Sequence, residues 1–337
     1  MAEIIRADGL VKRYGEVVAL DGLDLSVQEG TIVALLGPNG AGKTTAVSIL
    51  TTLIEPNEGS ASVAGIDVLK QPAEVRKIIG LSGQYAAVDK DLTGFENLDM
   101  IGRLYHLGRK KSRSRARELL ERFDLSEAGD RPVKTYSGGM RRRLDLAGAL
   151  VAESPVLFLD EPTTGLDLIS RTELWRLIRN LIDQGNTLLL TTQYLEEADR
   201  LADDVLVIDY GKTIAQGSTD ELKDMVGGER IEIKVTDSAH LPAASEMLGR
   251  IAVGDLTGDD RPRTVVAPVS DGVKQLAELL KNFEAAGIGV SEAVLRRPTL
   301  DDVFLALTGA STESREVEEP QLALESGRRG RGRGLPS

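Results

Sequence analysis

The sequence has no cysteine and only two histidines among its 337 residues. Without cysteine the chain can form neither disulfide bonds nor thiolate metal sites, which fits a reducing compartment. Basic residues are in the minority: 41 lysines and arginines stand against 53 acidic residues, which gives a net charge of −12. Proteins that bind nucleic acid usually carry a basic excess, so the charge argues against a nucleic-acid partner.

Long hydrophobic runs are missing as well. No apolar stretch approaches the roughly 18 residues that a membrane-spanning helix requires. The first residues, from Met1 to Arg6, lack the basic start and the apolar run of a signal peptide. We therefore expect any role at a membrane to depend on a partner that spans it.

The length of the chain allows one large domain and a smaller one. Residues 1–30 alternate apolar and polar positions between glycines, which predicts short antiparallel strands. A charged helical pattern follows at 88–150, and we expect a helical subdomain at about 86–150 within a first domain at 1–226. Farther on, helical segments separate apolar runs that indicate buried strands, so the core should be a parallel α/β sheet. These runs cover residues 156–159, 187–192 and 205–208.

Gly227 and Gly228 mark the expected end of the first domain, just after a capping box at Ser218 that opens one more helix. Residues 229–310 predict a small α+β domain. From Ser311 the apolar periodicity is lost, so residues 311–337 should be a disordered tail. The four arginines at 328–333 could contact anionic lipid, but a solvated tail is the simpler interpretation. The small domain has strand patterns at 231–235, 263–269 and 288–295 and helical patterns at 239–249 and 272–286.

Residues 37–45 fit the phosphate-loop pattern G-x-x-x-x-G-K-[ST], between a strand-like run at 31–36 and a helix predicted over 43–53. Glycines let the backbone N–H groups face phosphate oxygens, and the helix N-terminus adds a positive dipole. Lys43 should reach the β- and γ-phosphates, and the Thr44 hydroxyl should bind Mg²⁺. A glycine-rich turn without a ligand is the alternative. The candidate ATP-binding residues here are Gly37, Pro38, Asn39, Gly40, Ala41, Gly42, Lys43, Thr44 and Thr45.

A second signal lies where the apolar run at 156–159 ends in two adjacent carboxylates, Asp160 and Glu161. Asp160 would hold Mg²⁺ through water, as in other phosphate-loop ATPases. Glu161 would polarise the attacking water as a general base. Carboxylates that merely end a strand are the alternative, and the phosphate loop upstream makes that alternative weaker.

The third signal is the loop of Ser137, Gly138 and Gly139. Ser137 is placed to cap a helix that begins near Met140, and the glycines leave backbone N–H groups uncovered, so the loop forms a second anion site. One ATP needs only one cradle from its own subunit. The natural use of the second is to bind the γ-phosphate of ATP held by another copy. A simple helix-capping loop is the alternative.

With these motifs in place, residues 4–225 resemble the nucleotide-binding domain of ATP-binding-cassette (ABC) proteins. The resemblance implies a parallel-sheet core, an antiparallel β-subdomain and a helical subdomain, with ATP and Mg²⁺ as ligands. It also implies a head-to-tail dimer with a second copy of the chain. Tyr14 would stack on adenine, Gln84 would bind Mg²⁺ and sense the attacking water, and Asp167 would cross the dimer interface.

Two positions depart from the ABC pattern. Met140 stands where the family usually has glutamine, next to an intact anion-binding loop. Gln193 stands where most members carry a histidine that contacts the γ-phosphate, and neither His106 nor His240 is placed to replace it. An amide can donate a hydrogen bond to a phosphate oxygen but cannot carry charge or a proton. Catalysis should therefore depend more heavily on Glu161.

Residues 83–85, 135–143, 191–198 and 300–305 are together similar to the daunorubicin-resistance ATPases of actinobacterial drug exporters. The similarity implies a peripheral subunit on the cytoplasmic face of the membrane, which powers export of a hydrophobic drug or antibiotic through a separate ABC-2 type permease. Exporters of lipids, polysaccharides or ions share this cassette and remain alternatives. Translation-associated ABC proteins normally carry two cassettes, and chromosome-structure ATPases carry a long coiled coil. This chain has one phosphate loop, about 100 residues before Ser137.

A last helix is predicted near the end of the small domain, where Thr299 is a good N-cap and Asp302 takes the third helical position. We expect this helix to dock the small domain. A functional alternative is that it couples the small domain to the dimer or to the permease. Its apolar stripe should consist of Leu300, Val303, Phe304 and Leu307.

Overall fold

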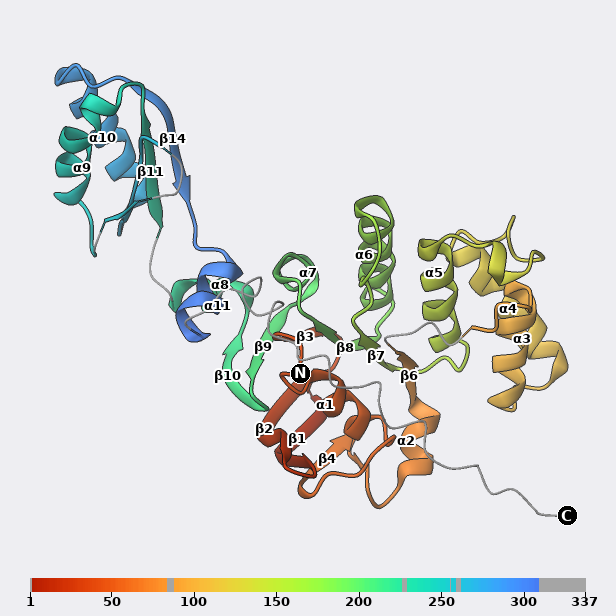
Figure 1. Cartoon of the computed structure of the whole chain (residues 1–337). Helices are drawn as coiled ribbons and strands as arrows, with labels where there is room; N and C mark the ends of the chain where they lie inside the picture. Colours follow the sequence, from red (N-terminus) through yellow and green to blue (C-terminus); the bar gives the residue numbers. More distant parts are fainter. Residues whose placement is uncertain (1, 84–87, 226–228, 255, 259–261, 309–337) are drawn as a thin grey trace, which may run out of the picture.

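The computed structural model describes residues 2–83, 88–225, 229–254, 256–258 and 262–308, and its described strands form three sheets (Figure 1). Gln84, the expected boundary at Gly227 and Gly228, and the expected tail at 311–337 lie outside the described residues. In the described part of the chain, no helix is both long and apolar enough to cross a membrane. We call the described residues up to 225 the large lobe and residues 229–296 the small lobe.

The first sheet is antiparallel and consists mainly of two long strands, β1 (Glu3–Tyr14) and β2 (Val17–Gln28). The strands are longer than predicted, because Gly22 lies within β2 rather than breaking it, whereas Gly15 and Gly30 lie outside the two strands as expected. Gly9 and Gly22 have φ angles of 58° and 83° and lie at shifts in the pairing register, so they form β-bulges inside the ladder. The sheet has the order β2-β1-β4-β5, completed by β4 (Glu58–Val63) and β5 (Ile66–Asp67).

The central sheet has the strand order β10-β9-β3-β8-β7-β6 and confirms the expected parallel core. Neighbouring strands from β9 to β6 are all parallel, and the edge strand β10 runs antiparallel to β9. Because the strands are parallel, their carboxyl ends meet at one edge. The strands are β3 (Ile32–Leu36), β6 (Ile79–Ser82), β7 (Val156–Asp160), β8 (Thr187–Thr192), β9 (Asp204–Asp209) and β10 (Lys212–Gly217).

Helices cover both faces of the central sheet. On one face, α1 (Lys43–Leu50) contributes to a core that the parallel and antiparallel sheets share. This helix was expected to reach residue 53, but it ends at Leu50 because Thr52 adopts a left-handed φ of 64°. A second core lies on the other face, against α5, α6 and α7. The other described helices of this lobe are α2 (Pro72–Ile78), α3 (Gly94–Leu104), α4 (Arg109–Arg122), η1 (Val133–Thr135), α5 (Gly138–Ala149), α6 (Leu168–Ile182), α7 (Leu195–Leu201) and α8 (Thr219–Met225).

The small lobe is an antiparallel sheet of order β12-β13-β11-β14 with α9 and α10 against one face (Figure 1). It has an apolar core of its own, which includes Ile233 of β11, Leu248 of α9 and Phe283 of α10. This arrangement confirms the expected α+β character. Its elements are β11 (Arg230–Val235), η2 (Ser238–His240), α9 (Leu241–Gly249), β12 (Thr257–Gly258), β13 (Thr264–Pro268), α10 (Gly272–Ala285) and β14 (Val290–Arg296).

The last helix of the described chain, α11 (Leu300–Thr308), packs against the large lobe. It contacts α7 and α8 (Thr219–Met225), and Figure 1 shows α8 and α11 side by side. Leu300, Val303 and Phe304 are buried in the same cluster as the core residues of the large lobe. The chain therefore returns to the large lobe after it has built the small one.

Both predicted capping boxes are confirmed. Thr299 Oγ1 accepts from the Asp302 N–H at 3.3 Å, and Asp302 Oδ2 accepts from the Thr299 N–H at 2.8 Å. Ser218 and Glu221 make the corresponding pair at the start of α8. The predicted stripe on α11 is shorter than expected, because Leu307 is 39% exposed.

Candidate functional site

The phosphate loop connects β3 to α1 at the carboxyl edge of the central sheet. Close packing requires two of its glycines. A Cβ on Gly37 would lie 2.3 Å from the Ile208 carbonyl oxygen, and one on Gly42 would lie 2.4 Å from the Ala19 oxygen. Gly42 is the N-cap of α1 at φ 105°, with no side-chain cap and no acidic residue in the first turn. The first N–H groups of α1 are thus available to an anion, as the predicted cradle requires.

We expect Gly42→Ala to destabilise the fold by about 2–5 kcal/mol, because left-handed strain costs about 1–2 kcal/mol and the clash adds to it. Gly40→Ala is the matched control. Gly40 also has a positive φ, of 78°, but a Cβ there meets no atom within 4 Å. Urea unfolding of the two variants measures the difference. Equal losses would show that the close approach at Gly42 contributes nothing.

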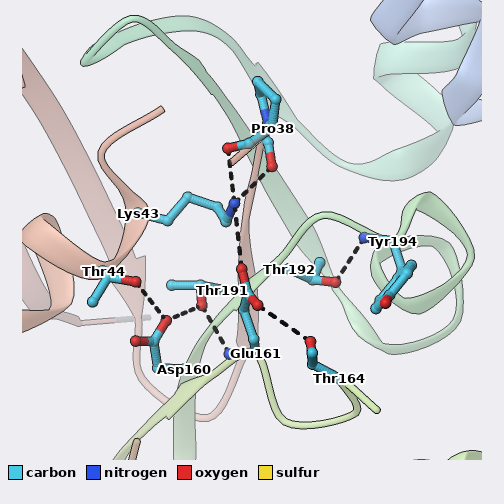
Figure 2. Close-up of polar contacts among 10 residues, drawn as sticks. Pro38, Lys43, Thr44, Asp160, Glu161, Thr164, Thr191, Thr192 and Tyr194 are labelled. Atoms are coloured by element: carbon cyan, nitrogen blue, oxygen red, sulfur yellow. Dashed lines mark hydrogen bonds and ion pairs between the residues drawn. The ribbon is translucent and has the colours of Figure 1, made fainter. Parts of the chain in front are cut away.

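Lys43 begins α1 and is only 4% exposed. Its ammonium donates to the carbonyl oxygens of Gly37 and Pro38 at 2.8 and 3.0 Å and lies 3.6 Å from Glu161 Oε1 (Figure 2). Burial lowers the pKa of Lys43, and the carboxylates of Glu161 and Asp160 oppose this shift. The structure therefore places the predicted phosphate ligand beside the predicted base.

Thr44 and Asp160, two of the predicted magnesium ligands, meet in the structure. Thr44 Oγ1 donates to Asp160 Oδ1 at 3.3 Å, and Thr191 Oγ1 donates to the same oxygen at 2.5 Å (Figure 2). Hydroxyl and carboxylate oxygens are the hard ligands that Mg²⁺ prefers. The described residues hold no group of three or more His, Cys, Asp or Glu side chains that could bind a metal. The donor set fits Mg²⁺ that is also bound to phosphate oxygens and water.

Glu161 has a φ of 48°, in the left-handed region that side-chain-bearing residues rarely adopt. Its N–H donates to the main-chain oxygen of Thr191 at 3.2 Å and to the Thr191 hydroxyl at 3.0 Å. Its carboxylate accepts from Thr164 Oγ1 at 3.2 Å and is 8% exposed. The turn in the backbone directs the carboxylate toward Lys43 (Figure 2).

The loop that begins at Ser137 packs against the start of α6. Ser137 is the N-cap of α5 and accepts from the Met140 N–H at 3.1 Å, as predicted. A Cβ on Gly139 would lie 2.6 Å from Ser170 Oγ. Ser170 in turn donates to Asp167 through its N–H at 2.9 Å and its hydroxyl at 3.0 Å, and these hydrogen bonds lower the pKa of Asp167. The structure thus connects the Ser137 loop to Asp167 within one chain.

Exposed apolar residues lie at two of the predicted sites. Tyr14 ends β1 and is 50% exposed, next to Val17 and Val18 at 65% and 45%. At the start of α6, directly after Asp167, Leu168 and Ile169 are 67% and 73% exposed. Apolar surface beside functional loops is typical of a face that a ligand or another protein covers.

Gln193 lies between β8 and α7 and is partly buried. The N-cap of α7 is Tyr194 rather than Gln193, and the Tyr194 N–H donates to Thr192 Oγ1 at 2.9 Å (Figure 2). Gln193 is thus placed at the carboxyl edge of the same sheet that presents Asp160. Gln84, which we expected to bind Mg²⁺ and sense the attacking water, lies outside the described residues.

Sequence reasoning missed several buried polar groups around this site. The Thr191 hydroxyl donates to the Asp160 carboxylate and accepts from the Glu161 N–H. The only feature of the sequence that could have indicated this role is a pair of threonines at the end of a leucine-rich strand. Glu197 of α7 is fully buried and accepts from Trp175 Nε1 at 3.0 Å. Burial raises the pKa of Glu197, and neighbouring hydrogen-bond donors oppose the shift. Nothing in the sequence separates this glutamate from an exposed one.

Comparison with known proteins agrees with this geometry. The family described as ABC transporter matches residues 20–164, and the family described as ATP-binding protein DrrA1-3-like, C-terminal domain, matches residues 217–308. The daunorubicin resistance ATP-binding protein DrrA2 of Streptomyces coeruleorubidus is 56% identical over 94% of this chain and 98% of that protein. The doxorubicin resistance ATP-binding protein DrrA of Mycobacterium tuberculosis is 48% identical over 91% and 94% of the two chains. The Nod factor export ATP-binding protein I of Ralstonia nicotianae is 39% identical over 91% and 94%.

Solved structures of similar fold include ATP-binding cassettes of ABC transporters. The ADP conformation of one cassette of an ABC transporter has a TM-score of 0.60 and 28% identity, over 66% of this chain and 93% of that one. A nucleotide-free cassette has a TM-score of 0.61 and 27% identity, over 66% and 94%. A dimeric bacterial ABC transporter cassette has a TM-score of 0.59 and 25% identity, over 64% and 98%.

Proposed function

We propose that this chain, which belongs to the DrrA-like ATP-binding proteins of ABC transporters, is the ATP-hydrolysing subunit of a drug exporter. The site assignment rests on one observation. At one edge of the parallel sheet, Thr44 contacts Asp160 and Lys43 lies beside Glu161. ATP hydrolysis needs a phosphate ligand, a metal-binding pair and a base within one buried cluster.

Each residue has a part in the proposed reaction. The loop N–H groups and Lys43 bind the β- and γ-phosphates of ATP. Mg²⁺ neutralises phosphate charge when bound, and Thr44, Asp160 and Gln84 are the residues that would hold it. Glu161 accepts a proton from water while the water oxygen bonds to the γ-phosphorus and ADP departs. The Lys43 ammonium lies 3.6 Å from Glu161 Oε1, so the phosphate ligand and the proposed base are neighbours.

A second copy of the chain completes the site in this proposal. Ser137, Gly138 and Gly139 of one copy bind the γ-phosphate of ATP held by the other, while Tyr14 stacks on its adenine. Asp167 crosses the interface, and the exposed Leu168 and Ile169 beside it supply apolar surface for the contact. Supporting this arrangement, a similar cassette is described as dimeric. ATP then stabilises the closed dimer, and its hydrolysis removes that stabilisation.

Gln193→Ala should lower turnover about ten- to hundredfold, because one hydrogen bond to a charged phosphate is worth about 1.5–3 kcal/mol. ATP affinity should change little, since Lys43 and the loop carry most phosphate contacts. Gln193→His is the matched control and should keep substantial activity, because imidazole presents a donor at similar reach. Steady-state kinetics and thermal melts decide the matter. Unchanged turnover in Gln193→Ala, or a loss of melting temperature alone, would remove Gln193 from the site.

The cargo and the membrane partner are inferred from the relatives. Two of them are named for resistance to daunorubicin or doxorubicin, which supports a hydrophobic drug or antibiotic as cargo. We infer that a separate ABC-2 type permease carries it and that this chain binds the permease at the cytoplasmic face of the membrane. Export of another amphiphile is the second candidate, because a relative at 39% identity is named for Nod factor export.

Drug accumulation in cells tests the cargo directly. Cells that produce the chain together with a candidate permease should accumulate less daunorubicin than cells with the permease alone. Lys43→Ala in the same cells is the matched control and should restore accumulation. If the wild-type chain hydrolysed ATP but cells with wild type and cells with Lys43→Ala accumulated equal amounts of daunorubicin, drug export would be contradicted. The assignment of the chain as an ATPase would still stand.

We also propose the domain limits as residues 1–226 for the cassette and 229–310 for the C-terminal domain. The self-contained core of the small lobe supports a separate unit between α8 and α11. The packing of α11 on α7 and α8 indicates that this unit is joined to the cassette at both of its ends.

A further inference from the structure

Three consecutive arginines follow the Ser137 loop, and the proposed function gives them no role. They lie on the same helix, α5, but in different surroundings. Arg141 is partly buried and donates to the Tyr136 oxygen at 3.1 Å. Arg143 is partly buried and lies 4.0 Å from Glu173. Arg142 is only 7% exposed, so its charge must be satisfied inside the protein.

The Arg142 guanidinium is satisfied chiefly by main-chain oxygens of the catalytic segment. Its Nε donates to the Pro162 oxygen at 2.7 Å, and its Nη2 donates to the oxygens of Asp160 and Glu161 at 3.0 and 3.1 Å. Its Nη1 donates to the Gly83 oxygen at 2.6 Å, at the residue directly before Gln84. One side chain from α5 thus contacts the backbone at the carboxyl ends of two neighbouring strands, β6 and β7.

A carboxylate on the same helix supports this arrangement. Asp145 Oδ2 lies 3.5 Å from Arg142 Nη1 and accepts from Ser82 Oγ at 2.5 Å. Asp145 therefore connects Arg142 to the end of β6, one residue before Gly83. Burial lowers the pKa of Arg142, whereas Asp145 is foremost among the carboxylates that oppose the shift.

The geometry of the guanidinium makes this contact specific. It is planar and presents its donors in a fixed fork, so it can satisfy several carbonyls only in one orientation. The sheet ladder of β7 ends at Asp160, and the chain turns there into the left-handed conformation of Glu161. A donor that binds the carbonyls on both sides of this turn holds it in place. A shift of α5 relative to β7 would break several of these hydrogen bonds together.

We propose that Arg142 is a positioning residue that fixes the backbone of Glu161 and ties it to the helix that carries the Ser137 loop. The carboxylate of Glu161 is thereby held in its catalytic direction only while α5 is correctly seated. This inference rests on the proposed role of Glu161 as the base. Arg142 itself contacts the main chain of Asp160 and Glu161, not the Glu161 carboxylate that would take the proton.

The test compares Arg142→Gln and Arg142→Lys with Arg141→Gln as the matched control on the same helix. Arg142→Gln should lower kcat about 30- to 100-fold, the scale of a misplaced catalytic group, while the Kd for ATP stays within about threefold. Arg142→Lys should recover part of kcat, because lysine keeps the charge but not the fork. Arg141→Gln should stay near the wild-type rate. A wild-type kcat in Arg142→Gln, or a parallel loss of ATP affinity, would overturn the proposal.

A double-mutant cycle separates positioning from general damage. In a Glu161→Gln background, Arg142→Gln should lower the residual single-turnover rate by less than about threefold, because the base that it positions is already gone. A loss as large as in the wild-type background would overturn the proposal. Should Arg142→Gln fail to fold, Arg142→Lys replaces it in the same double-mutant cycle. A wild-type kcat in Arg142→Lys would then overturn the proposal. Near wild-type turnover of Glu161→Gln alone would instead reject the proposed base.

Discussion

Glu161→Gln should lower ATP turnover by at least about 100-fold while ATP still binds, because a general base contributes about 10²- to 10⁴-fold. Glutamine keeps the size of the side chain and can still accept from Thr164, but it cannot take the proton. Since bound ATP persists, the variant should accumulate as a closed dimer with Mg²⁺. Phosphate release and size-exclusion chromatography measure the two effects.

Two further variants make the result specific to the base. Lys43→Ala should also abolish hydrolysis, but without the ATP-dependent dimer, because the buried ammonium that binds phosphate is lost. Glu196→Gln is the matched control: this glutamate is exposed and pairs loosely with Arg200 at 3.8 Å. It should keep the wild-type rate. If Glu161→Gln turned over ATP at a rate similar to that of the wild type, Glu161 would be wrongly assigned as the base.

Mixing Lys43→Ala chains with Ser137→Arg chains should restore hydrolysis that neither variant has alone. In a head-to-tail dimer, one site of each heterodimer collects both defects, and the other site has an intact phosphate loop and an intact Ser137 loop. Random mixing should recover about a quarter of the wild-type rate, because half of the dimers are heterodimers with one good site of two. Phosphate release from the mixture is the measurement.

Each variant mixed with wild-type chains provides the reference for that experiment. Such mixtures report whether one intact site can work beside a damaged one. Crosslinking or native mass spectrometry must show that heterodimers form. Heterodimers without recovered hydrolysis would mean that the chains do not share their sites, or that the two sites depend on each other.

The buried strands were predictable from the sequence, because a parallel strand covered on both faces needs an unbroken apolar run. Residues 187–192 show this clearly, and they form β8. The positions of Lys43 and Asp160 were predictable for other reasons: Lys43 belongs to the phosphate-loop pattern itself, and Asp160 directly follows the apolar run at 156–159. Gly22 of β2 misled the prediction, since a glycine can bulge a strand as well as end it, and only the pairing register decides.

The groups that hold the catalytic backbone were not predictable, because their role depends on contacts distant in sequence. Thr191 lies 31 residues from Asp160 but donates to its carboxylate. Arg142 looks like its neighbours Arg141 and Arg143 in the sequence, and only burial distinguishes it. The sequence could not show that α11 packs on α7, because an apolar stripe does not specify the surface that covers it.

The return of α11 to the large lobe makes the small lobe an insertion rather than an appendage. A chain cut after residue 228 would lose Phe304, which is 1% exposed, and would open the surface of α7 and α8 to water. Replacing residues 229–298 with a short linker would instead leave that core whole. The small lobe is thus connected to the large lobe at two neighbouring points, after α8 and before α11. The second of these lies beside α7, the helix that follows Gln193. Any movement of the small lobe that displaced α11 would therefore disturb the packing of α11 against α7.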